Sequence, residues 1–231
     1  MPPVDETRAV AERYARRAVG DRYSYLLPDV WQTLQERQRA MLRLLSRQLG
    51  WTELASRRLV EVGCGNGGNL LEMMRMGFMP EHLIGLELLP DRVARARHVL
   101  PISVEVHAGD ALAAPIGPAS QDIVYQSVVF SSLLDPAFQQ RMADAMWTWA
   151  RPGGGVLWYD FVYDNPSNRD VRGIPLQRVR QLFPHGRITA RRVTLAPPLA
   201  RRVCRIHPSL YTTLNVVPLL RTHLLCWIQK P

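Results

Sequence analysis

The sequence predicts an α/β fold in which a mainly parallel sheet is covered by helices on both faces. Strand-length apolar runs alternate with helix-length segments from residue 58 onward, and a glycine cluster joins the first of these strands to its helix. A chain of 231 residues with 47% apolar side chains can also bury one full core. In such sheets ligands bind at the carboxyl ends of the strands, near the point where strand order reverses.

Each element follows from apolar periodicity and from helix start and stop signals. Two helices are expected before the glycine cluster, at 5–18 and from Pro28-Asp29 to a stop at Gly50. Strands are then expected at 58–62, 82–88, 103–108, 122–127, 155–162, 187–195 and 221–229. Helices are expected between them at 67–76, 90–100, 135–150 and 175–183. The connection 196–218 is long for a strand pair, and such connections are usually lids or binding loops.

The net charge of +9 is concentrated in the last quarter of the chain. Residues 169–231 hold eleven arginines, one lysine and one aspartate, a net charge of +11. This favours an anionic partner such as a phosphate, nucleic acid or acidic lipid, with a solvated basic surface as the structural alternative. There is no secretory signal and no apolar run long enough to span a membrane, and three cysteines at unrelated spacings indicate reduced thiols. We therefore expect a cytoplasmic protein whose membrane contact, if any, is peripheral.

The stretch VEVGCGNGGNL, residues 60–70, is a strand that ends in an acid, followed by a nucleotide-binding type of glycine loop. The glycines alone do not identify the nucleotide. Glu61 stands two residues before Gly63, where an acid suits a cationic ligand group. Glu87 ends the second strand, where a carboxylate accepts both hydroxyls of a ribose. Asp110 follows the third strand and can accept the exocyclic amine of adenine.

Together these residues resemble the class I S-adenosylmethionine-dependent methyltransferases. The acid-x-Gly-x-Gly-x-Gly pattern is met at 61–67, the family's Pro-Gly-Gly turn appears at 150–154, and the resemblance covers about residues 55–165. It implies a Rossmann-like, doubly wound, seven-stranded sheet with an antiparallel last strand. It also implies an N-terminal helical cap at 1–50 over the active site, and a methyltransferase domain at 51–231 with a basic lid at about 196–218.

The resemblance implies S-adenosylmethionine as cofactor and S-adenosylhomocysteine as product. The expected cofactor-binding residues are Glu61, Gly63, Cys64, Gly65, Asn66, Gly67, Asn69, Glu87, Leu88, Gly109, Asp110, Ala111 and Gln126. This donor carries no phosphate, and its ammonium and sulfonium groups explain an acid beside the loop. A nicotinamide dehydrogenase would usually need a second domain, for which the chain leaves little room after the fifth strand.

The acceptor is expected beside the loop that follows the fifth strand, where Asp, Tyr, Asn and Arg side chains gather. A turn-rich polar loop is the structural alternative. Asp160 is the expected general base, with Asp164 and His223 as further catalytic candidates. The candidate substrate-binding residues are Tyr159, Asn165, Arg169, Arg172 and Tyr211. No spacing of His, Asp or Glu indicates a metal site.

The expected function is methyl transfer to a small-molecule or glycan acceptor, at an oxygen of a phosphate- or carboxylate-bearing substrate. The segment after the fourth strand lacks Asn/Asp-Pro-Pro-Tyr, which disfavours methylation of nucleic-acid bases. RNA or protein methylation and small-molecule N-methylation are the alternatives. Two segments, YDNPSNRDVRG and PLLRTHLLCWIQK, are similar to bacterial methyltransferases of cell-surface glycan pathways, which implies a role in glycan biosynthesis.

Overall fold

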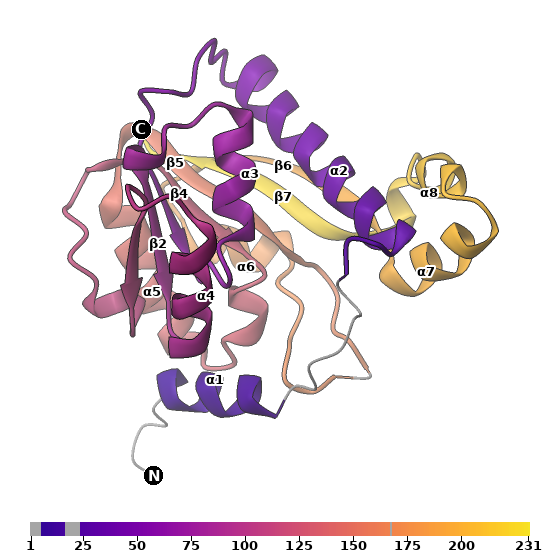
Figure 1. Cartoon of the computed structure of the whole chain (residues 1–231), viewed down its shortest axis with the longest axis horizontal. Helices are drawn as coiled ribbons and strands as arrows, with labels where there is room; N and C mark the ends of the chain where they lie inside the picture. Colours follow the sequence, from indigo (N-terminus) through magenta and orange to yellow (C-terminus); the bar gives the residue numbers. More distant parts are fainter. Residues whose placement is uncertain (1–5, 17–23, 167) are drawn as a thin grey trace.

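A seven-stranded sheet in the order β3-β2-β1-β4-β5-β7-β6 forms the centre of the computed structural model, which describes residues 6–16, 24–166 and 168–231 (Figure 1). The strands are β1 Leu59–Val62, β2 Leu83–Glu87, β3 Glu105–Ala108, β4 Gln121–Ser127, β5 Ala150–Phe161, β6 Arg187–Leu195 and β7 Arg221–Gln229. Strands β1 to β5 pair in parallel, and β7 runs antiparallel to both of its neighbours. The predicted mixed sheet with an antiparallel last strand is confirmed.

Helices cover both faces of the sheet, as the alternation predicted. The helices are α1 Glu6–Ala15, α2 Pro28–Arg43, α3 Gly68–Met76, α4 Pro90–Val99, α5 Pro136–Trp149, α6 Leu176–Leu182, α7 Pro197–Ile206 and α8 Ser209–Leu214. A π-helical segment, Leu44–Gln48, extends α2, and short 3₁₀ turns lie at Pro80–His82, Ala111–Ala113, Phe130–Ser132 and Pro218–Leu220. One core cluster joins the sheet to α2, α3 and α4, and the other joins it to α5 and α6.

Successive residues of each strand point to opposite faces, and this decides where polar side chains lie. In β1, Leu59 belongs to the core on the α2–α3 side, whereas Val60 and Val62 belong to the core on the α5–α6 side. Glu61 therefore points toward α2 and α3. In β5, Tyr159 joins the α2–α3 core, so that Asp160 points to the opposite face.

The connection 196–218, expected to be a loop, contains two helices. Helix α7 begins with Pro197-Pro198 and buries Ala200 and Cys204 at helical spacing, beside Leu195 and Tyr211. Strand β5 also begins earlier than expected, because pairing with β4 continues through the Ala150–Gly154 turn across a register shift. The ends of the first predicted helix, at residue 5 and residues 17–18, lie outside the described residues. Within the described ranges no helix is long and apolar enough to cross a membrane.

Candidate active site

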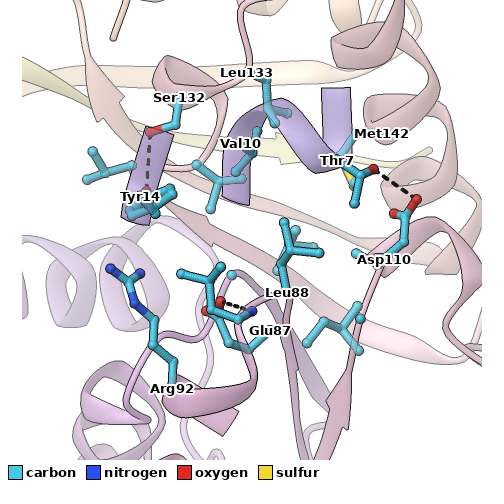
Figure 2. Close-up of a pocket in the computed structure, with 18 of the residues that line it drawn as sticks. Thr7, Val10, Tyr14, Glu87, Leu88, Arg92, Asp110, Ser132, Leu133 and Met142 are labelled. Atoms are coloured by element: carbon cyan, nitrogen blue, oxygen red, sulfur yellow. Dashed lines mark hydrogen bonds between the residues drawn. The ribbon is translucent and has the colours of Figure 1, made fainter. Parts of the chain in front are cut away.

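A cavity of about 220 Å³ lies at the carboxyl ends of the central strands. The strand order reverses between β1 and β4, and residues following both strands line the cavity, as the general rule for such sheets requires. The residues that line it include Thr7, Val10, Tyr14, Gly63, Glu87, Arg92, Asp110, Ser127, Val128, Ser132 and Met142. Figure 2 shows Thr7 and Asp110 toward one end of the cavity and Tyr14, Arg92 and Ser132 toward the other.

The glycine loop approaches the cavity with backbone alone at Gly63. Its φ is +68°, and a Cβ built on it would lie 2.6 Å from Cγ2 of Val129. A side chain at this position would therefore clash and would also strain the backbone. On the facing loop Val128 has a φ of +60°, a conformation that costs a β-branched residue of the order of 1–3 kcal/mol.

Glu87 lies at the centre of the cavity and also holds its walls together. Oε2 accepts the backbone N–H of Gly65 at 2.8 Å, and Oε1 accepts that of Leu89 at 2.9 Å. The carboxylate thus ties the glycine loop to the turn that begins α4. Each oxygen keeps a further lone pair toward the cavity, which suits a ligand with two neighbouring hydroxyl groups.

Asp110 closes one end of the cavity, where it contacts the N-terminal helix. Oδ1 accepts the backbone N–H of Leu112 at 2.9 Å, and Oδ2 accepts the hydroxyl of Thr7 at 3.2 Å (Figure 2). The carboxylate is an acceptor only, so its remaining capacity suits an amine such as that of adenine. In this conformation Thr7 uses part of that capacity.

Helix α1 covers the cavity with one face. Thr7, Val10 and Tyr14 line it at spacings of three and four residues, which place side chains on the same side of a helix. A buried ion pair fixes the helix: Arg13 Nη2 donates to Glu6 Oε1 at 2.5 Å, and that oxygen also accepts the N–H of Leu134 at 2.7 Å. Helix α1 is therefore fixed to the segment that follows β4.

Glu61 is fully buried beneath the glycine loop and has an incomplete set of partners. Asn69 Nδ2 donates to its Oε1 at 2.6 Å, whereas its Oε2 has no hydrogen-bond partner within the described part of the chain. Burial raises the pKa of Glu61 to about 8, which the bond from Asn69 and the charge of Arg37 oppose. A buried acceptor without a partner beside a cavity marks a place where a ligand's donor group would bind.

Arg37 of α2, which no sequence pattern indicated, contacts both Asn69, the partner of Glu61, and Ser127, which lines the cavity. Its Nη2 donates to Asn69 Oδ1 at 2.7 Å and to Glu72 Oε2 at 3.1 Å, and its Nη1 donates to Ser127 Oγ at 3.4 Å. The guanidinium also lies 5.3 Å from the centre of the Tyr159 ring. A cation beside Glu61 suits a ligand group that carries both an ammonium and a carboxylate.

The thirteen residues expected to bind cofactor divide into lining residues and supporting residues. Those that line the cavity are Gly63, Glu87, Leu88, Gly109, Asp110 and Ala111. Those outside the lining are Glu61, Cys64, Gly65, Asn66, Gly67, Asn69 and Gln126, of which Asn66 is exposed to solvent. Cys64 packs in the core, and Gln126 accepts the N–H of Val129 at 3.0 Å and so holds the loop that faces Gly63.

Asp160, the expected general base, does not reach the cavity. It is fully buried on the α5 side of the sheet, where its oxygens accept the N–H of Ser131 at 3.1 Å and of Phe161 at 2.8 Å. Burial raises the pKa of Asp160 to about 6, and these N–H groups oppose the rise. Its geometry is that of a positioning residue, which holds the turn carrying Ser132 at the cavity wall.

The other two catalytic candidates also lie away from the cavity lining. His223 is buried and stacks on the Tyr159 ring, with 4.8 Å between ring centres, because the two residues lie on neighbouring strands of the α2–α3 face. Burial, together with the charge of Arg37, lowers the pKa of His223 to about 3. Asp164 is exposed, and its Oδ1 accepts the N–H of Gly173 at 2.8 Å, which closes the loop after β5.

The five expected substrate-binding residues do not line the cavity either. Tyr159 is buried and its hydroxyl bonds that of Thr194 at 2.8 Å, and Tyr211 is buried in the small core of α7 and α8. Asn165, Arg169 and Arg172 are exposed on the loop after β5. The backbone N–H of Arg172 nevertheless donates to the carbonyl oxygen of Ser131 at 2.8 Å, next to the lining residue Ser132. The substrate-binding roles of these residues stay predictions.

Sequence reasoning missed the residues that α1 and α4 bring to the cavity. Thr7, Val10 and Tyr14 have a helical spacing that could have been found in the sequence, but nothing there indicates which surface they cover. Arg92 stands in the first turn of α4, two residues after Pro90. No cluster of three or more potential metal ligands occurs in the described ranges.

The residues present fit an adenosyl-methionine compound. Glu87 suits the ribose, Asp110 suits the adenine amine, and the buried, unpartnered Oε2 of Glu61 suits the methionine ammonium. Arg37 is placed to pair with the methionine carboxylate through atoms that now bind Asn69 and Ser127. The backbone approach at Gly63 leaves room for such a ligand, which needs no phosphate cradle.

Residues 59–154 match the family described as a methyltransferase domain. Trans-aconitate 2-methyltransferase of Afipia carboxidovorans is 29% identical over 68% of this chain and 56% of its own length. Fatty-acid O-methyltransferase of Mycolicibacterium smegmatis is 32% identical over 63% of this chain and 53% of its own length. The chain thus spans about half the length of the curated relatives it matches.

A solved structure with the same fold is that of an S-adenosylmethionine-dependent methyltransferase from Mesorhizobium loti. The TM-score is 0.57 at 15% sequence identity, and the match covers 83% of this chain and all of the other. At this identity the likeness shows the arrangement of strands and helices alone.

Proposed function

We propose that the chain is a class I methyltransferase that uses S-adenosylmethionine to methylate an oxygen of a small anionic acceptor. The match of residues 59–154 to a methyltransferase domain, and the methyltransferases among its relatives, support this reaction class. When bound, the cofactor supplies a methyl group that its sulfonium activates for transfer to a nucleophile. The roles proposed for the chain are to hold the cofactor through Glu61, Glu87 and Asp110 and to orient the acceptor in a cavity from which α1 excludes water.

This proposal rests on the side chains at the end of the cavity opposite Asp110. Arg92 is the one cation in the described lining, and its guanidinium lies 4.5 Å from the centre of the Tyr14 ring. Tyr14 in turn lies beside Ser132, with 3.3 Å between their hydroxyl oxygens. Arginine binds carboxylates and phosphates through paired hydrogen bonds, so this end suits an acceptor that carries such a group.

The same end offers no described side chain that is a ready general base. The acids of the lining are Glu87 and Asp110, both proposed to bind the cofactor, and the described lining contains no histidine. An alcohol needs a base to become nucleophilic, whereas a carboxylate is already ionised near neutral pH. We therefore favour a carboxylate oxygen as the methylated atom. The names of the two relatives above, which refer to trans-aconitate and fatty acid, support this choice.

Two further parts of the proposal concern the acceptor class and the compartment. A phosphate-bearing sugar of a glycan pathway would satisfy Arg92 equally well, so sugar phosphates belong among the acceptors to be tested. The three cysteines are free and buried, in keeping with a reducing compartment, and we propose the cytoplasm as the place of the reaction.

The test is an acceptor panel of small carboxylic acids, sugar phosphates and their neutral analogues, measured with wild type and with Arg92→Met. We expect turnover of anionic acceptors only, and a KM that rises about ten-fold or more in the variant, since a charge-assisted pair contributes roughly 1.5–3 kcal/mol. Affinity for S-adenosylhomocysteine, measured separately by calorimetry, should stay unchanged. Arg95→Met, an exposed arginine of the same helix, is the matched control. Equal turnover of neutral analogues would reject the anionic acceptor.

A further inference from the structure

The connection between β6 and β7 forms a lobe of its own, which consists of α7, α8 and the segment Asn215–Leu220. Figure 1 shows α7 and α8 projecting from the sheet beside the start of α2, and α2 packs against both helices. The lobe has a small core of Leu195, Ala200, Cys204 and Tyr211. Its outer surface is therefore presented by an ordered unit.

That surface combines arginine with exposed aliphatic side chains. On α7, Arg202, Arg205 and Ile206 share the outer face because they are separated by three and four residues, and Ile206 is 78% exposed. The segment after α8 exposes Val216 (69%) and Leu219 (82%). Single exposed apolar residues are ordinary, but a run of them on one small lobe indicates an interaction surface.

Specific hydrogen bonds hold this apolar segment in its exposed position. The Arg221 guanidinium donates to the carbonyl oxygen of Asn215 at 2.7 Å, to that of Val216 at 3.4 Å and to that of Arg192 at 3.1 Å. The segment is thus tied to the end of β6 while its side chains stay in solvent. These bonds keep Val216 and Leu219 exposed, although exposure of apolar side chains does not stabilise the isolated chain.

The positive charge of the lobe indicates which kind of partner it can bind. From Val171 to the last residue of the sequence there is no aspartate or glutamate. The acids that face the lobe from α2 are Asp29, which influences Cys204, and Glu36, which accepts the N–H of Thr194. Among the residues that the structure describes, neither Arg202 nor Arg205 forms a salt bridge.

We infer that the α7–α8 lobe docks the protein on an anionic lipid bilayer. Arginines attract acidic headgroups, and exposed aliphatic side chains of the same lobe gain free energy by entering the acyl boundary. Nucleic acid fits the same charge less well, because single strands are held by stacking on aromatic side chains and the one aromatic of the lobe, Tyr211, is buried.

The place of the lobe gives this docking a consequence for the active site. Strand β6 is parallel to β1, since both β6 and β5 are antiparallel to β7, so the lobe leaves the sheet at the edge where the cavity opens. In the strand order the lobe lies three strands from β4, roughly 15 Å at ordinary strand spacing. A docked molecule would turn the edge that carries the cavity toward the membrane.

The experiment measures co-sedimentation of the full chain with vesicles of phosphatidylcholine, with and without phosphatidylglycerol. The variants are Arg202→Gln/Arg205→Gln and Val216→Ser/Leu219→Ser. The control is Arg95→Gln/Ile102→Ser, whose exposed side chains lie in and after α4. Thermal unfolding checks the fold of each variant, and single substitutions replace any double variant that unfolds.

We expect binding only to vesicles that contain phosphatidylglycerol. The arginine variant should lower the partition coefficient about thirty-fold, at about five-fold per arginine, and the apolar variant about ten-fold. The control should bind as wild type does. Equal binding of the variants and the control would overturn the inference, as would binding to RNA but not to vesicles. If wild type forms a dimer that the variants lose, while the variants still bind vesicles as wild type does, the lobe is instead a contact surface for a second copy of the chain.

Discussion

Replacing Glu87 by alanine tests the most central contact of the proposed cofactor site. The carboxylate has two functions, because it accepts N–H groups from Gly65 and Leu89 and offers lone pairs to the cavity. The variant should therefore lose both ligand affinity and some stability. Glu81→Ala, an exposed acid just before β2, is the matched control.

The expected magnitudes follow from those contacts. A hydrogen bond to a charged group contributes roughly 1.5–3 kcal/mol, so two bonds to ribose hydroxyls, partly replaced by water in the variant, amount to about 3 kcal/mol. This corresponds to an affinity about a hundred-fold lower. The two N–H groups left without the carboxylate can bind water, so the free energy of unfolding should fall by only about 1–2 kcal/mol.

Calorimetric titration with S-adenosylhomocysteine gives the affinity, and urea unfolding gives the stability. The result expected is a large loss of affinity in a folded variant, with Glu81→Ala unchanged in both measurements. An affinity within about three-fold of wild type would refute the ribose role of Glu87, because a difference that small corresponds to less than about 1 kcal/mol.

Three further predictions concern residues around the cavity. Burial raises the pKa of Glu61 from 4.5 to about 8, so the stability it contributes is complete below about pH 4.5 and is lost as the pH rises to about 8. The free energy of unfolding of Glu61→Gln, measured with urea, should therefore rise relative to that of wild type as the pH increases from about 4.5 to about 8. A difference that stays constant with pH would contradict the raised pKa of Glu61. Arg37→Met leaves the buried carboxylate of Glu72 unpaired and should cost about 3–5 kcal/mol of unfolding free energy, whereas a loss below about 1 kcal/mol would argue against a buried pair. If Asp160 positions the turn of Ser131 and Ser132 and exchanges no proton with the acceptor, Asp160→Asn should lower kcat without removing any limb of the pH–rate profile near pH 6. Loss of such a limb would support Asp160 as the base.

The sheet and the cofactor side of the site could be predicted because their signals are local. Alternating strands and helices, the glycine loop and Glu87 at a strand end each lie within a few residues of one another. The parallel order of the strands then brings Gly63, Glu87 and Asp110 to one edge whatever the details of packing.

The acceptor side could not be predicted in the same way, because its contacts join distant segments. Tyr14 meets Ser132 across 118 residues of sequence and also lies against Arg92 of α4. Asp160 shows that the correct face of the sheet is not enough: it points to the α5 side, from which Met142 lines the cavity, but its oxygens accept the backbone N–H groups of Ser131 and Phe161. Helix α7, by contrast, had a readable signal in its paired prolines and in Ala200 and Cys204.

The most direct test of the central claim is a crystal structure of the protein with S-adenosylhomocysteine. The adenine amine is expected beside Asp110, the ribose hydroxyls on Glu87, and the sulfur facing the end lined by Tyr14, Arg92 and Ser132. A ligand bound elsewhere, or a sulfur turned away from Arg92, would contradict the assignment of the two ends of the cavity and with it the proposed acceptor site.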